Sequence, residues 1–125
     1  MGKAGPRTNS AARHGAVHRV PFRPMTDPDR TVLIAGNWKM NGSKADATAW
    51  AEAARATASA TTAEIALFPA DPWLALVSHV VGAPDGPVSL GGQACHPEAS
   101  GAFTGATSAS MLADLGCRYV LCGHS

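Results

Sequence analysis

Four short apolar runs alternate with stretches long enough to hold a helix, and this alternation limits the fold more than any other feature of the sequence. β-Branched and other apolar residues fill each run, as in strands buried on both faces. Helical crossovers make such strands parallel, with right-handed connections. The pattern therefore predicts an α/β fold, either a (β/α)8 barrel or a doubly wound sheet. The predicted strands are residues 31–35, 64–68, 88–93 and 118–122.

Helix-forming composition and end signals place a helix in each of the three crossovers. The first is the alanine-rich stretch from Lys44 to about Ala60. In the second, Asp71 is the predicted N-cap, Pro72 the first helical residue and Gly82 the stop. The third is capped by residue 107 or 108. The residues predicted to face the core are Trp50, Ala54 and Ala58 in the first helix and Met111, Leu112 and Leu115 in the third.

The loop after the first predicted strand concentrates polar chemistry in very few residues. Gly36 is expected to end the strand, and Asn37, Trp38 and Lys39 follow it directly. Ser43 then provides an N-cap for the first helix. Parallel α/β folds place their ligand sites at the carboxyl ends of the strands. A lysine in this loop, beside an amide and an indole, therefore indicates a ligand site.

Composition and charge exclude several classes of function. The chain has 125 residues, enough for one domain, and 46% of them are hydrophobic while 15% are charged. Residues 1–26 carry five basic residues and no acidic ones, whereas residues 27–125 carry five basic and nine acidic residues, a net charge of −4. An acidic domain does not predict a nucleic-acid surface. No apolar run is long enough to span a membrane, so no membrane partner is expected.

The cysteines indicate a reducing compartment rather than a disulfide framework. An odd number of cysteines cannot all pair within the chain, which favours a cytoplasmic location. Cys95, His96, Cys117, Cys122 and His124 could be combined into a zinc site. No C-x2-C pair exists, however, and the last two cysteines alternate with apolar strand residues, which is typical of core cysteines. Neither a metal nor a cofactor is therefore predicted.

The N-terminal residues differ in character from the rest of the chain. Residues 1–30 are rich in Gly, Pro, Ser, Ala and Arg and lack apolar periodicity, so we expect a disordered tail. Met25 is an alternative start of the protein. An Arg-rich segment without acids is also compatible with a targeting peptide, although the prolines oppose an amphipathic helix there. The folded domain is expected to cover residues 31–125.

Three motifs in this order resemble the triosephosphate isomerase family. They are GNWKMNG at 36–42, GAFTG at 101–105 and YVLCGHS at 119–125, each following a predicted strand or ending one. The Gln93-x-Cys95 stretch and the Met-Leu-x-x-Leu-Gly run at 111–116 also fit this family. The resemblance implies that the chain is the N-terminal half of a (β/α)8 TIM barrel, with four parallel strands and three intervening helices.

The resemblance also implies an activity and roles for particular residues. Members of this family interconvert dihydroxyacetone phosphate and glyceraldehyde 3-phosphate, a step of glycolysis and gluconeogenesis, through an enediolate. Such a reaction needs a base, an electrophile and positive charge for the phosphate and the developing oxyanion. By resemblance, Lys39 and His124 are catalytic, as the positive charge and the neutral electrophilic imidazole. Asn37 and Lys39 would bind the substrate, a small triose phosphate.

Several positions depart from the family pattern. Ala94 and Ala106 replace polar residues that are common in the family, in the region where its subunits meet. Thr104, at the tip of the family's interface loop, is retained, so a homodimer is implied. The sequence stops at Ser125, before the Glu-Arg-Arg that usually follows. We therefore expect the glutamate base and the closing loop to be lacking, and the chain to be poorly stable and to self-associate. The alternatives are an inactive truncated product or another sugar-phosphate isomerase on the same barrel.

Overall fold

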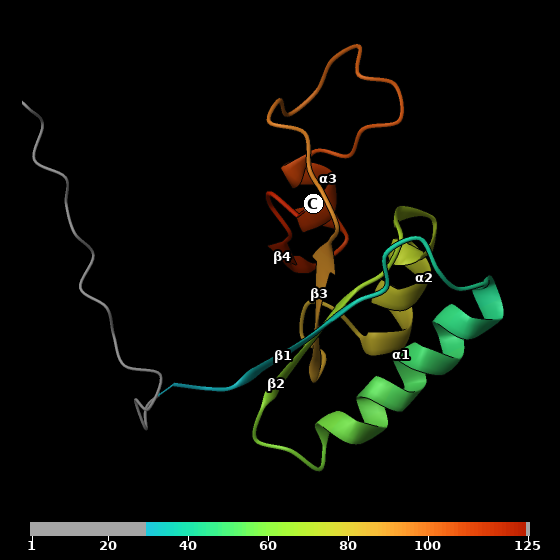
Figure 1. The fold of residues 1–125 in the computed structure, drawn as a ribbon, viewed down its shortest axis with the longest axis vertical. Helices are drawn as coiled ribbons and strands as arrows, with labels where there is room; N and C mark the ends of the chain where they lie inside the picture. The colour runs from blue at the N-terminus through green and yellow to red at the C-terminus, as the bar shows by residue number, and fades with distance from the viewer. Residues whose placement is uncertain (1–29, 125) are drawn as a thin grey trace, which may run out of the picture.

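A computed structural model describes residues 30–124, which form one four-stranded parallel sheet with helices between the strands (Figure 1). The strands lie in chain order, and each neighbouring pair is parallel. This confirms the parallel α/β fold predicted from the alternation, and it agrees with the half-barrel that the family resemblance implies. The tail expected over residues 1–30 lies outside the described residues, apart from Arg30. The elements are β1 (Leu33–Asn37), α1 (Lys44–Ala58), β2 (Glu64–Phe68), α2 (Asp71–Val81), β3 (Val88–Gly92), α3 (Ala109–Asp114) and β4 (Cys117–Val120).

The first strand differs from its prediction in its bounds and in its burial. Gly36 does not end β1, because it and Asn37 continue the pairing with the last two residues of β2. Leu33 and Ile34 are 46% and 54% exposed, so this strand is not buried on both faces. Within residues 30–124, β1 pairs with β2 alone and β4 with β3 alone. Both outer strands of the described sheet therefore keep an open edge.

The core lies between the sheet and the helices α1 and α2, which Figure 1 shows on the same side of the strands. Alternate residues of β2 and β3 point to this side, as the twofold repeat of a strand requires. Small alanines let α1 approach closely, whereas α2 contributes branched side chains. The buried residues are Ile65, Leu67, Val88 and Leu90 from the strands and Ala47, Ala51, Leu74, Val77, Val81 and Leu112 from the helices.

The helices correct three predictions about individual side chains. Trp50 is 41% exposed, because the inward stripe of α1 is centred on Ala47 and Ala51 instead. Met111 is 53% exposed, and only its neighbour Leu112 is buried in α3. Asp71 is the first residue of α2 rather than its N-cap, and its carboxylate accepts a hydrogen bond from the hydroxyl of Thr107 at 2.8 Å. Ala70 caps that helix without a side-chain hydrogen bond.

Gly91 packs closely against the ring of Phe68, and this contact leads to a stability prediction. A Cβ at Gly91 would lie 2.3 Å from Cε1 of Phe68, whereas a Cβ at Gly36 would meet its nearest atom at 3.6 Å. We expect Gly91→Ala to lower the free energy of unfolding by about 1–3 kcal/mol, the usual cost of overpacking. Gly36→Ala is the matched control and should change it by less than ~1 kcal/mol. Urea titrations followed by tryptophan fluorescence measure both, and equal values would contradict the packing argument.

A polar cluster occupies the face of the sheet opposite the helices. The Oε1 atom of Glu64 accepts hydrogen bonds from the hydroxyls of Tyr119 at 2.7 Å and Ser89 at 2.8 Å. Arg118 adds an ion pair with the same oxygen at 3.6 Å. The hydrogen bonds from Tyr119 and Ser89 lower the pKa of the Glu64 carboxyl, and the bond to Glu64 raises the pKa of the Tyr119 hydroxyl. One carboxylate thus joins β2, β3 and β4.

This cluster predicts acid-sensitive stability. Because the pKa of Glu64 is lowered in the folded chain, its contribution is complete above the ordinary carboxyl range and is lost as the pH falls through the folded value. We expect Glu64→Gln to lower the urea midpoint at pH 7. The difference from the unsubstituted chain should shrink as the pH falls towards about 3. Asp114→Asn is the control, since this residue has no part in the cluster. A difference that stays constant over that range would contradict the assignment.

Candidate functional site at the carboxyl edge of the sheet

Residues from three strand ends meet in one open cavity of about 280 Å³. Asn37 ends β1, and Lys39 and Met40 lie in the loop that follows. Gln93 follows β3 directly, and His124 follows β4. Because parallel strands point their carboxyl ends to one edge, residues far apart in sequence come together here. The structure thus brings together the three residues that the sequence singled out, and it adds Gln93 and Met40.

The backbone of Lys39 has an uncommon conformation. Its φ of 53° lies in the left-handed region, and no other non-glycine residue of the described chain has a positive φ. The amide N–H of Lys39 donates to Oδ1 of Asn37 at 2.9 Å. The side-chain amide of Gln93 donates to the carbonyl of Lys39, also at 2.9 Å. Both backbone polar groups of the lysine are therefore held by side chains that line the same cavity.

Tryptophans fix the loop around Lys39. The backbone N–H of Trp38 donates to the carbonyl of Phe68 at 3.0 Å, which continues the pairing of β1 with β2. The ring of Trp38 meets that of Trp50 edge-on, with centroids 5.0 Å apart. The indole N–H of Trp73 donates to the carbonyl of Gly42 at 3.0 Å. The exposed position of Trp50 therefore has a structural reason, since this ring packs on the loop rather than on the sheet.

The start of α1 closes this loop as predicted. Ser43 is the N-cap of the helix, and its hydroxyl accepts from the backbone N–H of Asp46 at 3.2 Å. The Asp46 carboxylate accepts from the backbone N–H of Ser43 at 2.8 Å, which completes a capping box. Hydrogen bonds from the side chain and backbone of Ser43 lower the pKa of Asp46. This carboxylate is thereby used in the cap, away from the cavity.

The charge of the cavity comes from Lys39. Among the described residues, its lining combines this ammonium with the imidazole of His124, two side-chain amides and a thioether, and it includes no carboxylate. His124 is exposed and follows Gly123, whose φ of 70° is in the left-handed region. Such a set of groups can attract an anion, donate hydrogen bonds to it and polarise an oxygen. It cannot by itself supply a carboxylate base.

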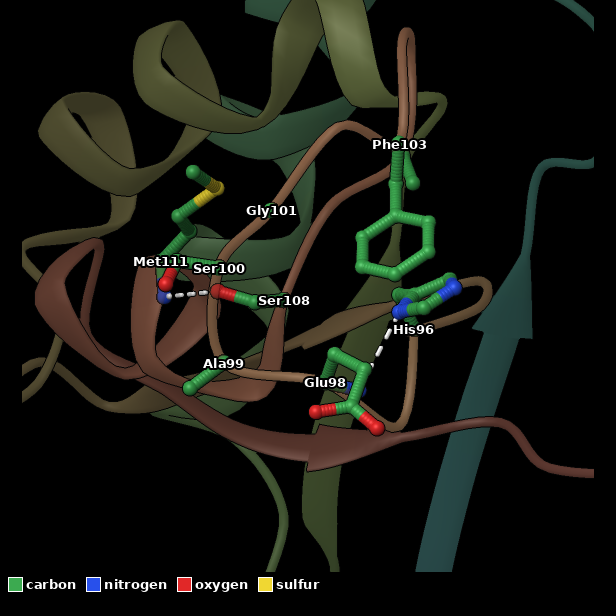
Figure 2. A pocket seen from close by; sticks show the side chains of 9 residues that line it. His96, Glu98, Ala99, Ser100, Gly101, Phe103, Ser108 and Met111 are labelled. Carbon is green, nitrogen blue, oxygen red and sulfur yellow. Dashed lines mark hydrogen bonds between the residues drawn. The ribbon is translucent and has the colours of Figure 1, made fainter.

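A second, smaller pocket lies in the long loop after β3 (Figure 2), and it shares no lining residue with the Lys39 cavity. His96 stacks on Phe103 with ring centroids 3.9 Å apart, and its Nδ1 accepts the backbone N–H of Glu98 at 3.1 Å. The pocket has a volume of about 110 Å³, and Met111 closes one side of it. Thr104 is exposed on this loop and does not line the Lys39 cavity. The described chain therefore does not bring its predicted interface residue to its own site.

The cysteines only partly match their predicted place in the core. Cys95 and Cys117 are half-buried, but Cys122 is exposed, because β4 ends at Val120 before reaching it. Burial raises the pKa of the Cys117 thiol, with a smaller contribution from the negative charge of Asp71. All three are free thiols. Among residues 30–124, no group of three or more His, Cys, Asp or Glu residues could hold a metal ion.

Fold and cavity together place this chain among the parallel β/α proteins, as a half-barrel of four strands with a cavity at the carboxyl ends of β1, β3 and β4. A sequence model of the family described as triosephosphate isomerase matches residues 32–125. The chain therefore belongs to the triosephosphate isomerase family.

The motif around Gln93 was identified in the sequence, but that residue was given no role. Its position directly after a strand, at the same edge as Lys39, was the signal that could have found it.

Individual relatives agree with this assignment. Triosephosphate isomerase of Alcanivorax borkumensis is 46% identical over 97 residues, which cover 78% of this chain and 37% of the relative. That of Dinoroseobacter shibae is 49% identical over 96 residues, covering 77% and 38%. A solved structure of triosephosphate isomerase from Bartonella henselae superimposes with a TM-score of 0.65 at 33% identity, covering 77% and 39%. The chain thus spans less than two fifths of the length of these relatives.

The structure also bears on membrane association. Within the described residues 30–124, none of the helices combines the length and apolar character that crossing a bilayer requires.

Proposed function

We propose that this chain provides the phosphate-binding lysine and the electrophilic histidine of a triose-phosphate isomerase, which interconverts dihydroxyacetone phosphate and glyceraldehyde 3-phosphate. The observation that carries the proposal is the convergence of Asn37, Lys39 and His124 on one cavity at the carboxyl edge. The names of the relatives support the same reaction. The reaction belongs to glycolysis and gluconeogenesis in the cytoplasm, and it requires no metal or cofactor.

Each residue has a role that follows from its chemistry. The Lys39 ammonium attracts the phosphate dianion and stabilises the oxyanion that develops beside it; two unit charges about 4 Å apart attract by ~1–4 kcal/mol in water or near a protein surface. Asn37 holds the backbone of this lysine and offers its amide to the substrate. His124 polarises the carbonyl and moves protons between the two oxygens of the enediolate.

The base that removes the carbon-bound proton does not come from residues 30–124, because none of their carboxylates lines the Lys39 cavity. Asp46 is used in the helix cap, and Asp71 accepts a hydrogen bond from Thr107. Glu64 lies in the polar cluster on the face of the sheet opposite the helices. Glu98 lines the second pocket. We therefore assign substrate binding and polarisation of the substrate carbonyl to the described residues. On its own, the 125-residue chain should bind the substrate without turnover.

A second copy of the chain is the proposed protein partner. Phe103 beside Thr104 is 44% exposed, and Val32 before the open edge of β1 is 65% exposed. Apolar surface of this kind is removed from water when protein surfaces associate. The exposed loop that carries Thr104 then reaches towards the lysine cavity of the other copy.

Isothermal titration calorimetry of the 125-residue chain tests the proposed function. Dihydroxyacetone phosphate should bind, whereas dihydroxyacetone, which lacks the phosphate, should give no measurable heat. Inorganic phosphate should compete with the phosphate ester, because both use the Lys39 ammonium. Equal binding of dihydroxyacetone and its phosphate would refute a phosphate site at Lys39.

A further inference from the structure

The conformation of Lys39 requires something to hold it. A non-glycine residue in the left-handed region is disfavoured by about 1–2 kcal/mol, because its Cβ approaches a carbonyl oxygen. Lysine is not among the residues whose short polar side chain relieves this cost locally. Lys39 is also exposed, so its own side chain is not packed into place. The restraint must therefore come from groups that contact its backbone.

Two side chains supply that restraint from different parts of the chain. Asn37, two residues earlier, accepts the N–H of Lys39, as Asn side chains commonly do in turns. Gln93 comes from the end of β3, 54 residues away in sequence, and donates to the carbonyl of Lys39 at 2.9 Å. The local bond folds the loop on itself. Asn37 is the last residue of β1, so its bond ties Lys39 to its own strand, whereas the bond from Gln93 connects Lys39 to the end of β3.

The second donor bond of Gln93 fixes where the amide itself lies. Its Nε2 also donates to the carbonyl of Phe68, the last residue of β2, at 2.9 Å. Both neighbours of this nitrogen are carbonyl oxygens, so the NH2 group must face them and both of its hydrogens are used. The same Phe68 carbonyl accepts the backbone N–H of Trp38 at 3.0 Å. Gln93 therefore fastens the lysine loop to β2 at the cavity.

We propose that Gln93 is a positioning residue, whose side-chain amide holds the backbone of Lys39 so that the ammonium stays at the cavity where a phosphate ester binds. This inference rests on the proposed function for the role of the ammonium. The geometric part, that Gln93 sets the conformation of Lys39, stands separately. Gln93 acts through Lys39 and needs no contact with the substrate.

Two variants of the full chain test this by opposite means. In Gln93→Glu, a carboxylate of the same shape faces two carbonyl oxygens and repels them. In Gln93→Met, the length is kept and both donors are removed. Glu98→Gln, on the loop after β3 and without contact to Lys39, is the matched control. NMR backbone chemical shifts of Lys39 report its left-handed conformation, and calorimetry reports affinity for dihydroxyacetone phosphate.

We expect both Gln93 variants to lose the left-handed shift pattern of Lys39 and to bind dihydroxyacetone phosphate at least about tenfold more weakly. The control should keep both. A purely structural role would lower the urea midpoint while leaving the Lys39 shifts and the affinity unchanged, and that result would overturn the inference. If the unsubstituted chain does not bind the phosphate ester, the proposed function fails, and the Lys39 shifts alone decide whether Gln93 sets its conformation.

The unsubstituted chain provides a measurement that does not depend on how the variants fold. Gln93 is the one glutamine of the sequence, so its side-chain NH2 signals are unambiguous. Because both hydrogens are bonded, they should exchange with solvent at least about tenfold more slowly than those of free glutamine. Exchange at the rate of free glutamine would overturn the inference.

Discussion

Replacing Lys39 by alanine is expected to weaken the binding of dihydroxyacetone phosphate by about 10- to 100-fold, the usual worth of a charge-assisted hydrogen bond. Lys39 carries the one ammonium among the residues that line the cavity. With the ammonium removed, the phosphate dianion would meet only amides, an imidazole and a thioether. Titration calorimetry at low salt measures the difference, which should shrink as added salt screens the charge.

Lys44→Ala is the control for this substitution. Lys44 begins α1, is exposed, and does not line the Lys39 cavity. The Lys44→Ala substitution removes the same charge from the chain as Lys39→Ala. Any loss of affinity that both variants share therefore reflects net charge rather than a specific contact. Equal affinities of Lys39→Ala and the unsubstituted chain would place the phosphate site elsewhere.

The purified 125-residue chain is expected to bind dihydroxyacetone phosphate without isomerising it measurably. General acid–base groups typically contribute about 10²- to 10⁴-fold to a rate, and none of the residues from 30 to 124 that line the cavity has a carboxylate to act as the base. His124 and Lys39 can polarise the substrate carbonyl, but polarisation alone leaves the proton on carbon.

An assay that couples the formation of glyceraldehyde 3-phosphate to a dehydrogenase measures this rate. Lys39→Ala serves as the background, because it removes the proposed phosphate contact while keeping every carboxylate. The two proteins should give the same rate within error. Turnover well above the Lys39→Ala background would mean that the chain supplies a base, and the assignment of the described carboxylates to other tasks would then be wrong.

The alternation of apolar runs was enough to predict the strands and their parallel order, because each run is short and ends at glycine, proline or a polar residue. The second strand was predicted at its observed bounds, Glu64–Phe68. The first was displaced, because its end is set by pairing with Phe68. Such pairing is a tertiary contact, which cannot be predicted from the residues of the first strand alone.

Three features of the site region could not be predicted from local patterns. Trp50 was assigned to the sheet face by its helical spacing with Ala54 and Ala58, but the buried stripe of α1 is centred on Ala47 and Ala51, and the indole packs on Trp38 instead. Asp71 has the chemistry of an N-cap, yet its carboxylate bonds to Thr107. Gln93 contacts a loop 54 residues away, so its role depends on the folded topology. The motif residues around Lys39 were found because they are contiguous in sequence.

We expect Asn37, Lys39 and His124 to line one site for a triose phosphate. An NMR titration of the isotopically labelled 125-residue chain with dihydroxyacetone phosphate tests it most directly, because each backbone and imidazole signal reports its own surroundings. Saturable shifts should centre on these three residues and Gln93, with little change in the polar cluster around Glu64. Saturable shifts that centre elsewhere, or none at millimolar ligand, would contradict this expectation.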